Sequence, residues 1–412
     1  MRARQPDQTG YVERAGVRVY YETFGAGEPA VLLLPTWSII HSRHWKSQIH
    51  FLARYSQVIT YDPRGNGLSD RPTDPAAYAD REFVTDGLAV MDAVGVDKAI
   101  AVGFSAGCFR ALVLAGDHPE RTLGAVFIGN GFPFAPPHAE RAKWAARFDE
   151  LVDSEEGWAR FNRHYWLRNY PGFISFFMDQ MFPEPHSTKQ IGDTTNWGLQ
   201  TTPDVLIATI KAPALSKEEI EGLVSRVRCP VLVLHGNNDR QSPVQRAAPL
   251  AEAVHGNCIV LEGSGHAPHA RDPVKINLLL RGFIDSIYET KRSLSWTRGR
   301  SRSKRALYVS SPIGLGHARR DIAIAAELRR LVPGLEIDWL AQHPVTELLK
   351  AHGERIHPAS SSASSGGSIR RRPSHARSVS RFRETQAALT PSDCSARAPL
   401  GQMATPAPIS LG

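Results

Sequence analysis

The sequence predicts an α/β protein in which helices cover a mostly parallel sheet and a helical segment is inserted into that sheet. Two observations lead to this fold class. Short, continuously apolar runs are typical of strands that are buried on both faces. Helical stretches separate these runs, which indicates a parallel, helix-covered sheet. We interpret the runs at residues 30–34, 57–61, 99–103, 125–128, 230–235 and 258–261 as the buried strands.

The other elements of this region follow from the same patterns. Residues 10–20 alternate between apolar and polar side chains and predict a hairpin of edge strands ahead of the first buried strand. Helices are expected between the strands, for example at 83–94, and a final helix is expected at about 273–290. The predicted core therefore comprises residues 10–130 and 226–290.

The segment at 131–225 differs from its surroundings, because proline and aromatic residues are frequent in it and its pattern is helical. We interpret it as a helical lid inserted into the fold. The alternative is an ordinary helical core, since aromatic side chains pack in cores more often than they line ligand sites. The lid interpretation is favoured because the strand pattern resumes after this segment.

The composition of the 412-residue chain is that of a soluble globular protein, with 42% hydrophobic and 22% charged residues. No run of about 18 uncharged apolar residues occurs, and no apolar stretch follows the basic N-terminus, so we expect neither a membrane span nor a secretory signal. The cysteines lack paired or metal-like spacing: Cys108, Cys229, Cys258 and Cys394. Reduced thiols in a cytoplasmic protein without a metal site are the expectation.

The net charge of +8 lies outside the predicted core. Residues 291–305 hold seven Lys or Arg and no acid, and residues 359–412 hold seven Arg against Glu384 and Asp393, which leaves a net charge of −4 for the rest of the chain. The basic residues thus belong to a linker at 291–305 and to a tail. No specific nucleic-acid partner is expected from them.

The segment Gly103-Phe104-Ser105-Ala106-Gly107 carries the first chemical signal. It follows a buried strand and precedes an apolar helix, which is the context that a nucleophile elbow requires. Gly103 and Gly107 allow the strand and helix to approach, so that the tight turn lifts the Ser105 hydroxyl clear of the sheet. The N-terminus of the helix favours developing negative charge nearby. Ser105 is therefore the candidate nucleophile.

A serine hydroxyl needs a base, and two later residues complete the pattern. His266 follows the strand at 258–261, and Asp239 follows the strand at 230–235. Both are therefore expected at the carboxyl edge of the sheet, where ligands bind in open α/β sheets. The order Ser105, Asp239, His266 is the order of this architecture, in which the acid fixes the tautomer of the histidine. A solvated loop residue is the commoner explanation for any one of them, but not for all three.

Two neighbouring residues were weighed as alternatives for these roles. His269 lies three residues beyond His266 but outside the small-residue turn Gly263-Ser264-Gly265. Asn130 follows the strand at 125–128, where some such enzymes carry their acid. An amide cannot act as the acid, which favours Asp239.

With these motifs the chain resembles the α/β-hydrolase superfamily over about residues 10–290. Residues 62–70 (DPRGNGLSD) resemble the family's turn after its fourth strand, and 117–121 (DHPER) resemble its usual helix end. Family members normally have His-Gly after the first buried strand, whereas this chain has Pro35-Thr36-Trp37. The resemblance implies that the backbone N–H groups of Trp37 and Ala106 form the oxyanion hole.

A serine nucleophile argues against the dehalogenase and epoxide-hydrolase branches, which need a carboxylate. The resemblance implies an acyl-enzyme route to hydrolysis of an ester, lactone, thioester or amide, or to cleavage of a C–C bond. We expect a carboxylesterase or lactonase that needs no cofactor and acts on a small to medium apolar substrate, because the lid is rich in aromatic residues. The alternative is a receptor that retains the fold and binds a ligand with little or no turnover. The oligomeric state is left open.

Residues 306–358 predict a second unit of strand, glycine turn, helix, strand, helix and strand. With Gly314, Gly316 and His317 in its first loop, it resembles the start of a two-Rossmann-domain (GT-B type) glycosyltransferase, in which the helix N-terminus suits an anion. A plain turn with structural glycines is the alternative. Residues 359–412 are rich in Ser, Arg, Pro and Ala and predict disorder. We therefore expect a fusion whose second enzyme is truncated, through a frame change near Ser360, and remnant glycosyltransferase activity is the least favoured function.

Overall fold

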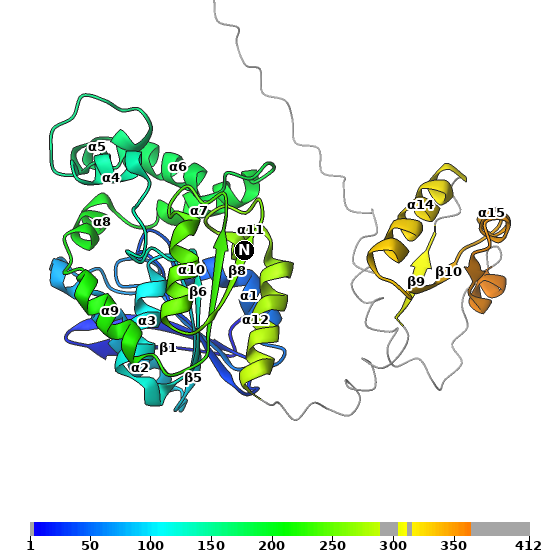
Figure 1. Cartoon of the computed structure of the whole chain (residues 1–412), viewed down its shortest axis with the longest axis horizontal. Coiled ribbons are helices and arrows are strands. Elements are labelled where there is room, and N and C mark those ends of the chain that lie inside the picture. Colours follow the sequence, from blue (N-terminus) through cyan, green and yellow to red (C-terminus); the bar gives the residue numbers. More distant parts are fainter. Residues whose placement is uncertain (1–3, 289–303, 311–314, 364–412) are drawn as a thin grey trace, which may run out of the picture. The chain divides into compact units, whose positions relative to one another are not determined.

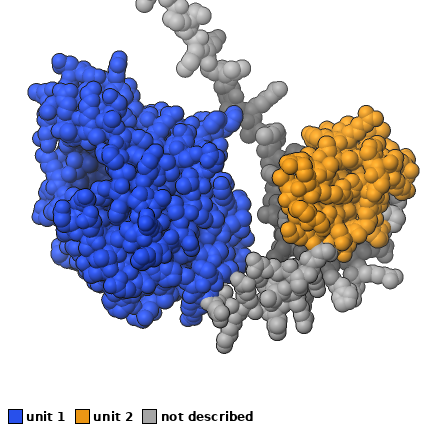
Figure 2. Space-filling model, viewed as in Figure 1, with its two compact units in different colours: residues 1–292 blue, residues 293–412 orange. Residues whose placement is uncertain are grey.

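The computed structural model describes residues 4–288, 304–310 and 315–363 of the chain. The chain divides into two compact units, Met1–Arg292 and Ser293–Gly412 (Figures 1 and 2). Most of the predicted linker at 291–305 and of the predicted tail at 359–412 lies outside the described residues. No helix of the described residues is long and apolar enough to cross a membrane.

An eight-stranded sheet forms the centre of the first unit, with the strand order β1-β2-β4-β3-β5-β6-β7-β8. The strands are β1 (Gln8–Arg14), β2 (Val17–Phe24), β3 (Ala30–Leu33), β4 (Val58–Tyr61), β5 (Ala99–Phe104), β6 (Thr122–Ile128), β7 (Val231–Gly236) and β8 (Asn257–Leu261). β2 pairs antiparallel with β1 and β4, and all other neighbours pair in parallel. Ala15 and Gly16 form the β1–β2 turn with φ angles of 48° and 72°, and a type I′ hairpin turn requires positive φ at both positions.

The two faces of the sheet carry separate hydrophobic clusters, because side chains alternate along each strand. Leu33 and Val102 point to one face, and Leu32 and Ala101 point to the other. Helices α1 (Lys46–Leu52) and α12 (Pro273–Ile287) pack on the first face, and the short α11 (Pro268–Arg271) precedes α12. Helices α2 (Asp80–Ala93), α3 (Gly107–Asp117), α9 (Lys217–Arg226) and α10 (Ala247–Ala253) cover the second face. Strands β3 to β7 are thus buried from both sides, as their apolar runs predicted. The apolar run of β8 was also expected to be buried, but β8 lies at the edge of the sheet and is only partly buried, with Val260 49% exposed.

The insertion lies between β6 and β7 and contains α4 (Ala139–Ala145), α5 (Arg163–Arg168), α6 (Tyr170–Met181), α7 (Thr188–Gly198) and α8 (Pro203–Ile210). Figure 1 shows these helices gathered at one end of the sheet. The predicted lid range of 131–225 also includes most of α9, but α9 packs against α3 beside the sheet. Its Leu223 and Val224 belong to the cluster on the second face, and Arg226 donates a hydrogen bond to the carbonyl of Gly116. We therefore restrict the lid to the helices α4–α8.

The second unit is a small parallel sheet with the order β11-β10-β9. Its elements are β9 (Arg305–Val309), α14 (Leu315–Leu331), β10 (Glu336–Leu340), α15 (Val345–Ala351) and β11 (Arg355–Ile356). Trp339 is fully buried and belongs to a separate core cluster with Ala318, Ala325 and Leu349. The predicted alternation of strands and helices is therefore present, and this unit has a small core of its own.

The predicted fold class is confirmed by this architecture, which combines a mostly parallel sheet with a helical insertion and a small parallel sheet after it. One detail differs in the second unit. The helix predicted from residue 317 begins at Leu315, so Gly316 and His317 lie in its first turn instead of in a loop. Gly314 lies outside the described residues.

Candidate active site

The turn between β5 and α3 holds Ser105 in an unusual backbone conformation. Its φ angle is +54°, which is uncommon for a residue with a Cβ atom and is typical of a nucleophile elbow. A Cβ atom at Gly103 would lie 2.2 Å from the carbonyl oxygen of Gly107, and one at Gly107 would lie 2.8 Å from that of Pro35. Both glycines are therefore required by close backbone contacts, and the strand and the helix meet tightly enough to expose Ser105.

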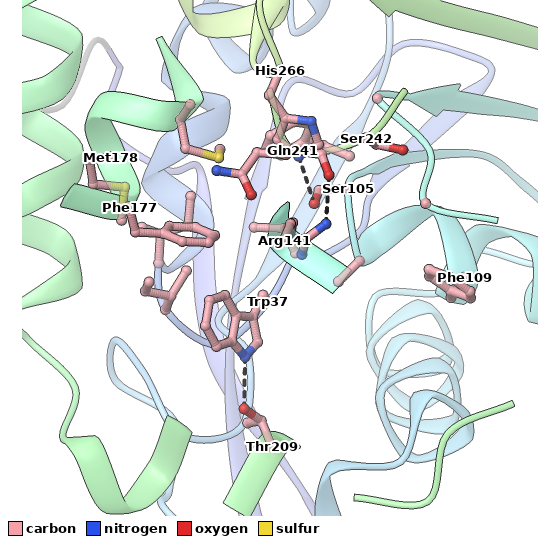
Figure 3. A pocket seen from close by; sticks show the side chains of 18 of the residues that line it. Trp37, Ser105, Phe109, Arg141, Phe177, Met178, Thr209, Gln241, Ser242 and His266 are labelled. Atoms are coloured by element: carbon pink, nitrogen blue, oxygen red, sulfur yellow. Dashed lines mark hydrogen bonds between the residues drawn. The ribbon is translucent and has the colours of Figure 1, made fainter. Parts of the chain in front are cut away.

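The structure brings Ser105, His266 and Asp239 into one chain of hydrogen bonds. His266 Nε2 lies 2.9 Å from Ser105 Oγ (Figure 3). His266 Nδ1 lies 2.7 Å from Asp239 Oδ2. His266 and Asp239 are only 3% and 5% exposed, so little water competes for these bonds. Nδ1 donates to the carboxylate, which leaves Nε2 free to accept the proton of Ser105.

Further donors hold the Asp239 carboxylate in place and keep it ionised. Oδ1 accepts hydrogen bonds from the backbone N–H groups of Gln241 at 2.7 Å and Ser242 at 2.9 Å. Oδ2 lies 3.1 Å from Nε2 of the buried His235. Burial by itself would raise the pKa of the Asp239 carboxyl, but the neighbouring His266 and His235 hold this pKa well below its usual range.

Asn130, one of the two alternatives from the sequence, supports the acid indirectly. Its side-chain amide lies 3.3 Å from His235 Nδ1 and is fully buried. Because the amide NH₂ donates to Nδ1, His235 carries its proton on Nε2, where it can donate to Asp239 or to the carbonyl of Ser242 at 3.0 Å. The residue after β6 is thus two hydrogen bonds away from the acid and is not the acid itself.

His269, the other alternative, does not contact Ser105. It lies behind Phe104, with ring centroids 4.3 Å apart, and its Nε2 is 3.1 Å from Nδ1 of His44. Burial, together with the nearby His266, lowers the pKa of His269 to about 3. Burial and the neighbouring His269 also lower the pKa of His44 well below its ordinary value. This neutral pair is a packed part of the wall beside the catalytic candidate His266.

The loop Pro35-Thr36-Trp37 runs beside the start of α3, where the oxyanion hole is expected. Arg110, which is 3% exposed, donates from Nη1 to the carbonyl oxygens of Pro35 at 2.8 Å and Thr36 at 2.5 Å. Within the described residues the backbone N–H groups of Trp37 and Ala106 have no hydrogen-bond acceptor. Both N–H groups are therefore available to a ligand, and Arg110 fixes the carbonyl groups of the loop that carries the first of them.

Ser105 and His266 open into a cavity of about 360 Å³ between the sheet and the lid. Trp37 reaches across it, because its indole N–H donates to Thr209 Oγ1 of α8 at 2.7 Å (Figure 3). Aromatic and thioether side chains form most of the apolar wall: Trp37, Phe104, Phe109, Phe161, Phe177, Met178 and Met181. This wall fits the expected apolar part of a substrate.

Two arginines that no sequence motif indicated also line the cavity. Arg141 lies on α4 of the lid, and Arg246 follows β7 near the start of α10. Burial lowers the pKa of Arg141 to about 10, while the Asp239 carboxylate opposes this shift. Neither side chain forms an ion pair with a carboxylate of the described residues. Local patterns gave no signal for them, because each reaches the cavity only through the folded lid and loops.

The residues of the second unit that were singled out from the sequence do not form a comparable site. Gly316 and His317 are exposed in the first turn of α14, and a Cβ atom at Gly316 would meet no atom within 4 Å. Across both units, the described residues contain no group of three or more His, Cys, Asp or Glu side chains that could hold a metal ion.

Comparisons with known proteins match the first unit. A family model described as "alpha/beta hydrolase fold" matches residues 29–273. RutD of Pseudomonas savastanoi pv. phaseolicola, provisionally named a carbamate hydrolase, is 27% identical over 249 residues, which are 60% of this chain and 90% of that protein. The 3-oxoadipate enol-lactonase 2 of Acinetobacter baylyi is 28% identical over 263 residues, which are 63% of this chain and 91% of that protein.

A solved structure is also similar to this chain. Est816, an N-acyl homoserine lactone degrading enzyme, aligns with a TM-score of 0.55 and 25% sequence identity, and the alignment covers 66% of this chain and 100% of that chain. The similar proteins named here are thus enzymes that act on carbamates or lactones by their names, and each is covered by this chain over 90% or more of its length.

Proposed function

Because the chain belongs to the α/β-hydrolase family and is a hydrolase of that family, we propose that it cleaves a carboxylic ester or lactone through an acyl-enzyme on Ser105. The observation that carries this proposal is the chain of hydrogen bonds from Ser105 through His266 to Asp239 at the floor of a largely apolar cavity. The similar enol-lactonase and homoserine lactone degrading enzyme support an ester or lactone as the bond that is cleaved.

In this mechanism Ser105 Oγ attacks the carbonyl carbon and its proton moves to His266 Nε2, while Asp239 stabilises the imidazolium. The carbonyl oxygen, on which negative charge develops, accepts hydrogen bonds from the backbone N–H groups of Trp37 and Ala106. The departing alcohol takes the proton from His266. Water, deprotonated by the same histidine, then attacks the acyl-enzyme, and His266 returns this proton to Ser105 Oγ as the acid is released. No cofactor enters any of these steps.

The test is labelling with a fluorophosphonate probe alongside turnover of short-chain and medium-chain aryl esters. The full chain is expected to be labelled and to turn over the esters, and Ser105→Ala is expected to do neither. The matched control is Ser286→Ala, because Ser286 lies on α12, where its hydroxyl donates only to the carbonyl of Phe283. A wild-type chain that neither labels nor turns over would refute the proposal and favour the receptor alternative.

For the second unit we propose only that it shares its evolutionary origin with the first part of a GT-B glycosyltransferase. The parallel sheet β11-β10-β9 supports this proposal. Incorporation of labelled sugar from sugar nucleotides is the measurement that tests for activity, and the expected result is none. The predicted cytoplasmic location is also a proposal, which fractionation of the source cells would test.

A further inference from the structure

The cavity above Ser105 is lined by two guanidinium groups, and neither of them forms an ion pair with a carboxylate of the described residues. Arg246 is 7% exposed, and it donates from Nε to the carbonyl of Ala135 and from Nη1 to that of Gly131, both at 2.9 Å. Arg141 donates from Nη1 to the carbonyl of Gln241 at 2.6 Å. All these acceptors are neutral, so they orient the two cations without compensating their charge.

Arg141 is partly buried, and two fully buried arginines elsewhere in this chain have carboxylate partners. Arg64 is 2% exposed and pairs with Asp86 at 2.6 Å, and Arg110 pairs with Asp80 at 3.4 Å. Burying a cation without a counter-charge is costly. No aspartate or glutamate lines the cavity, and Asp239, the nearby anion that acts on both Arg141 and Arg246, already interacts with His266 and His235. An anionic ligand in the cavity would therefore meet two cations and no acidic side chain in its wall.

From this placement we propose that the substrate carries a carboxylate, which Arg141 and Arg246 bind while Ser105 attacks an ester or lactone elsewhere in the same molecule. This inference rests on the proposed function. Guanidinium groups match the planar geometry of a carboxylate, which accepts two N–H groups side by side. The substrate is thus an apolar ester or lactone with one acidic end.

The apolar wall accounts for the rest of such a substrate. Trp37, Phe177 and Met178 belong to the same cavity. Figure 3 shows these three side chains, together with Arg141 and Gln241, around Ser105 and His266. A cavity of about 360 Å³ accommodates a small organic acid with an ester or lactone group. The arginines select the acidic end, and the aromatic wall accepts the remainder.

The competing explanation is that the arginines only tether the lid and the loops through their backbone hydrogen bonds. A tether needs a donor but no charge, whereas carboxylate binding needs the charge. Arg141→Gln keeps a donor and removes the charge, and Arg141→Lys keeps the charge. Arg147→Gln is the matched control, because Arg147 follows the same helix but is 40% exposed and pairs with Glu150.

The experiment uses the full chain and compares two aryl esters, 4-nitrophenyl hydrogen glutarate and its methyl ester. These two esters differ mainly in the free carboxylate. The ratio of kcat/KM for the acid over the methyl ester is expected to exceed ten in the wild type. It is expected to fall at least ten-fold in Arg141→Gln, through a rise in KM for the acid, and to change less than three-fold in Arg141→Lys and in Arg147→Gln. A wild-type ratio of one or less, or an unchanged ratio in Arg141→Gln, would overturn the inference while the proposed function stands.

A second measurement does not depend on variants or on turnover. 4-Phenylbutyrate is expected to bind the wild-type chain at least ten-fold more tightly than 4-phenylbutyramide by calorimetry, and 0.5 M NaCl is expected to reduce this difference, because salt screens the charges. If neither ester is cleaved, the proposed function fails, and this comparison still decides the carboxylate site. Equal binding of the acid and the amide would refute it.

Discussion

The Asp239 carboxylate has two oxygens with different partners, and this asymmetry determines what a substitution would do. Oδ1 accepts from two backbone N–H groups, whereas Oδ2 faces His266 and His235. An asparagine at this position would place its carbonyl oxygen toward the backbone donors. Its NH₂ group would then point at His266 Nδ1, which would have to lose its proton.

Asp239→Asn is therefore expected to force His266 into the tautomer that is protonated on Nε2 and cannot accept the proton of Ser105. The expected loss in kcat is about 10⁴-fold, as for the equivalent change in a serine protease. Ester turnover and fluorophosphonate labelling measure it. Asp204→Asn is the control, because Asp204 is exposed in the first turn of α8. A loss below ten-fold would show that Asp239 does not orient the base.

The neutral His44–His269 pair predicts how stability depends on pH. His269 has a pKa of about 3 in the folded chain, against about 6.5 when unfolded. Below pH 6.5 the unfolded chain therefore binds a proton that the folded chain does not, so the free energy of unfolding falls as the pH decreases toward 3. For His269 alone, this loss amounts to about 2 kcal/mol between pH 7 and pH 5.

His269→Gln is expected to reduce this pH dependence by about 2 kcal/mol, because glutamine does not titrate. Urea unfolding at pH 7.0 and pH 5.0 measures the difference for each protein, so that a uniform destabilisation by the substitution cancels. His50→Gln, at an exposed position of α1, is expected to leave the difference nearly unchanged. The same difference in wild type and His269→Gln would mean that His269 is not held neutral in the folded chain.

At the level of the elements, Trp37 joins the loop after β3 to helix α8 of the lid. Its indole ring lies 5.3 Å from that of Phe177, centroid to centroid, and its N–H donates to Thr209. The residue that carries an expected oxyanion donor in its backbone thus contacts the lid through its side chain. We therefore expect the position of the lid to affect the geometry of the expected oxyanion hole.

Thr209→Val removes the acceptor of the Trp37 indole N–H and is nearly isosteric. A lost hydrogen bond of this kind costs about 0.5–1.5 kcal/mol, which corresponds to a roughly two- to twelve-fold lower kcat/KM for aryl esters if closure is needed for turnover. Thr188→Val, at an exposed position of α7, is the control. A double-mutant cycle with Trp37→Phe isolates the interaction, and a coupling energy near zero would contradict the link.

The elements themselves could be predicted because their signals are local. The continuous apolar runs gave β3 to β8 within a few residues, and the glycines around Ser105 gave the elbow. Ser105, Asp239 and His266 could be predicted to lie close together, because each follows a strand and parallel strands end at the same edge of the sheet. The alternation of strand and helix patterns likewise predicted the elements of the second unit.

The sequence could not indicate the residues that act over long distances. Arg110 contacts Pro35, which is 75 residues away along the chain. The one sign of its role in the sequence is a charged residue within the apolar stretch of helix α3. Arg141 and Arg246 line the same cavity only because the lid packs over the sheet. The extent of the lid was also overestimated, because the helical pattern of α9 does not reveal that it packs against α3.

For the whole molecule, the division into two units determines where activity resides. Ser105, Asp239, His266 and the residues that line the cavity all belong to residues 1–292. The two clusters that cover the sheet are also built from this unit alone, whereas the second unit packs around Trp339 in a separate cluster. The first unit therefore contains both its own core and a complete candidate site.

A fragment of residues 1–292 is accordingly expected to fold and to hydrolyse aryl esters with a kcat/KM within two-fold of that of the full chain. Thermal unfolding followed at the tryptophans, together with ester turnover, measures both properties. The reciprocal fragment, residues 293–412, is expected to be inactive toward the same esters, because it lacks the nucleophile. A tenfold loss of kcat/KM in the 1–292 fragment, restored when the reciprocal fragment is added, would mean that the second unit contributes to the site and would refute its independence. An inactive fragment that does not unfold cooperatively would instead show that the first unit depends on the second for its stability.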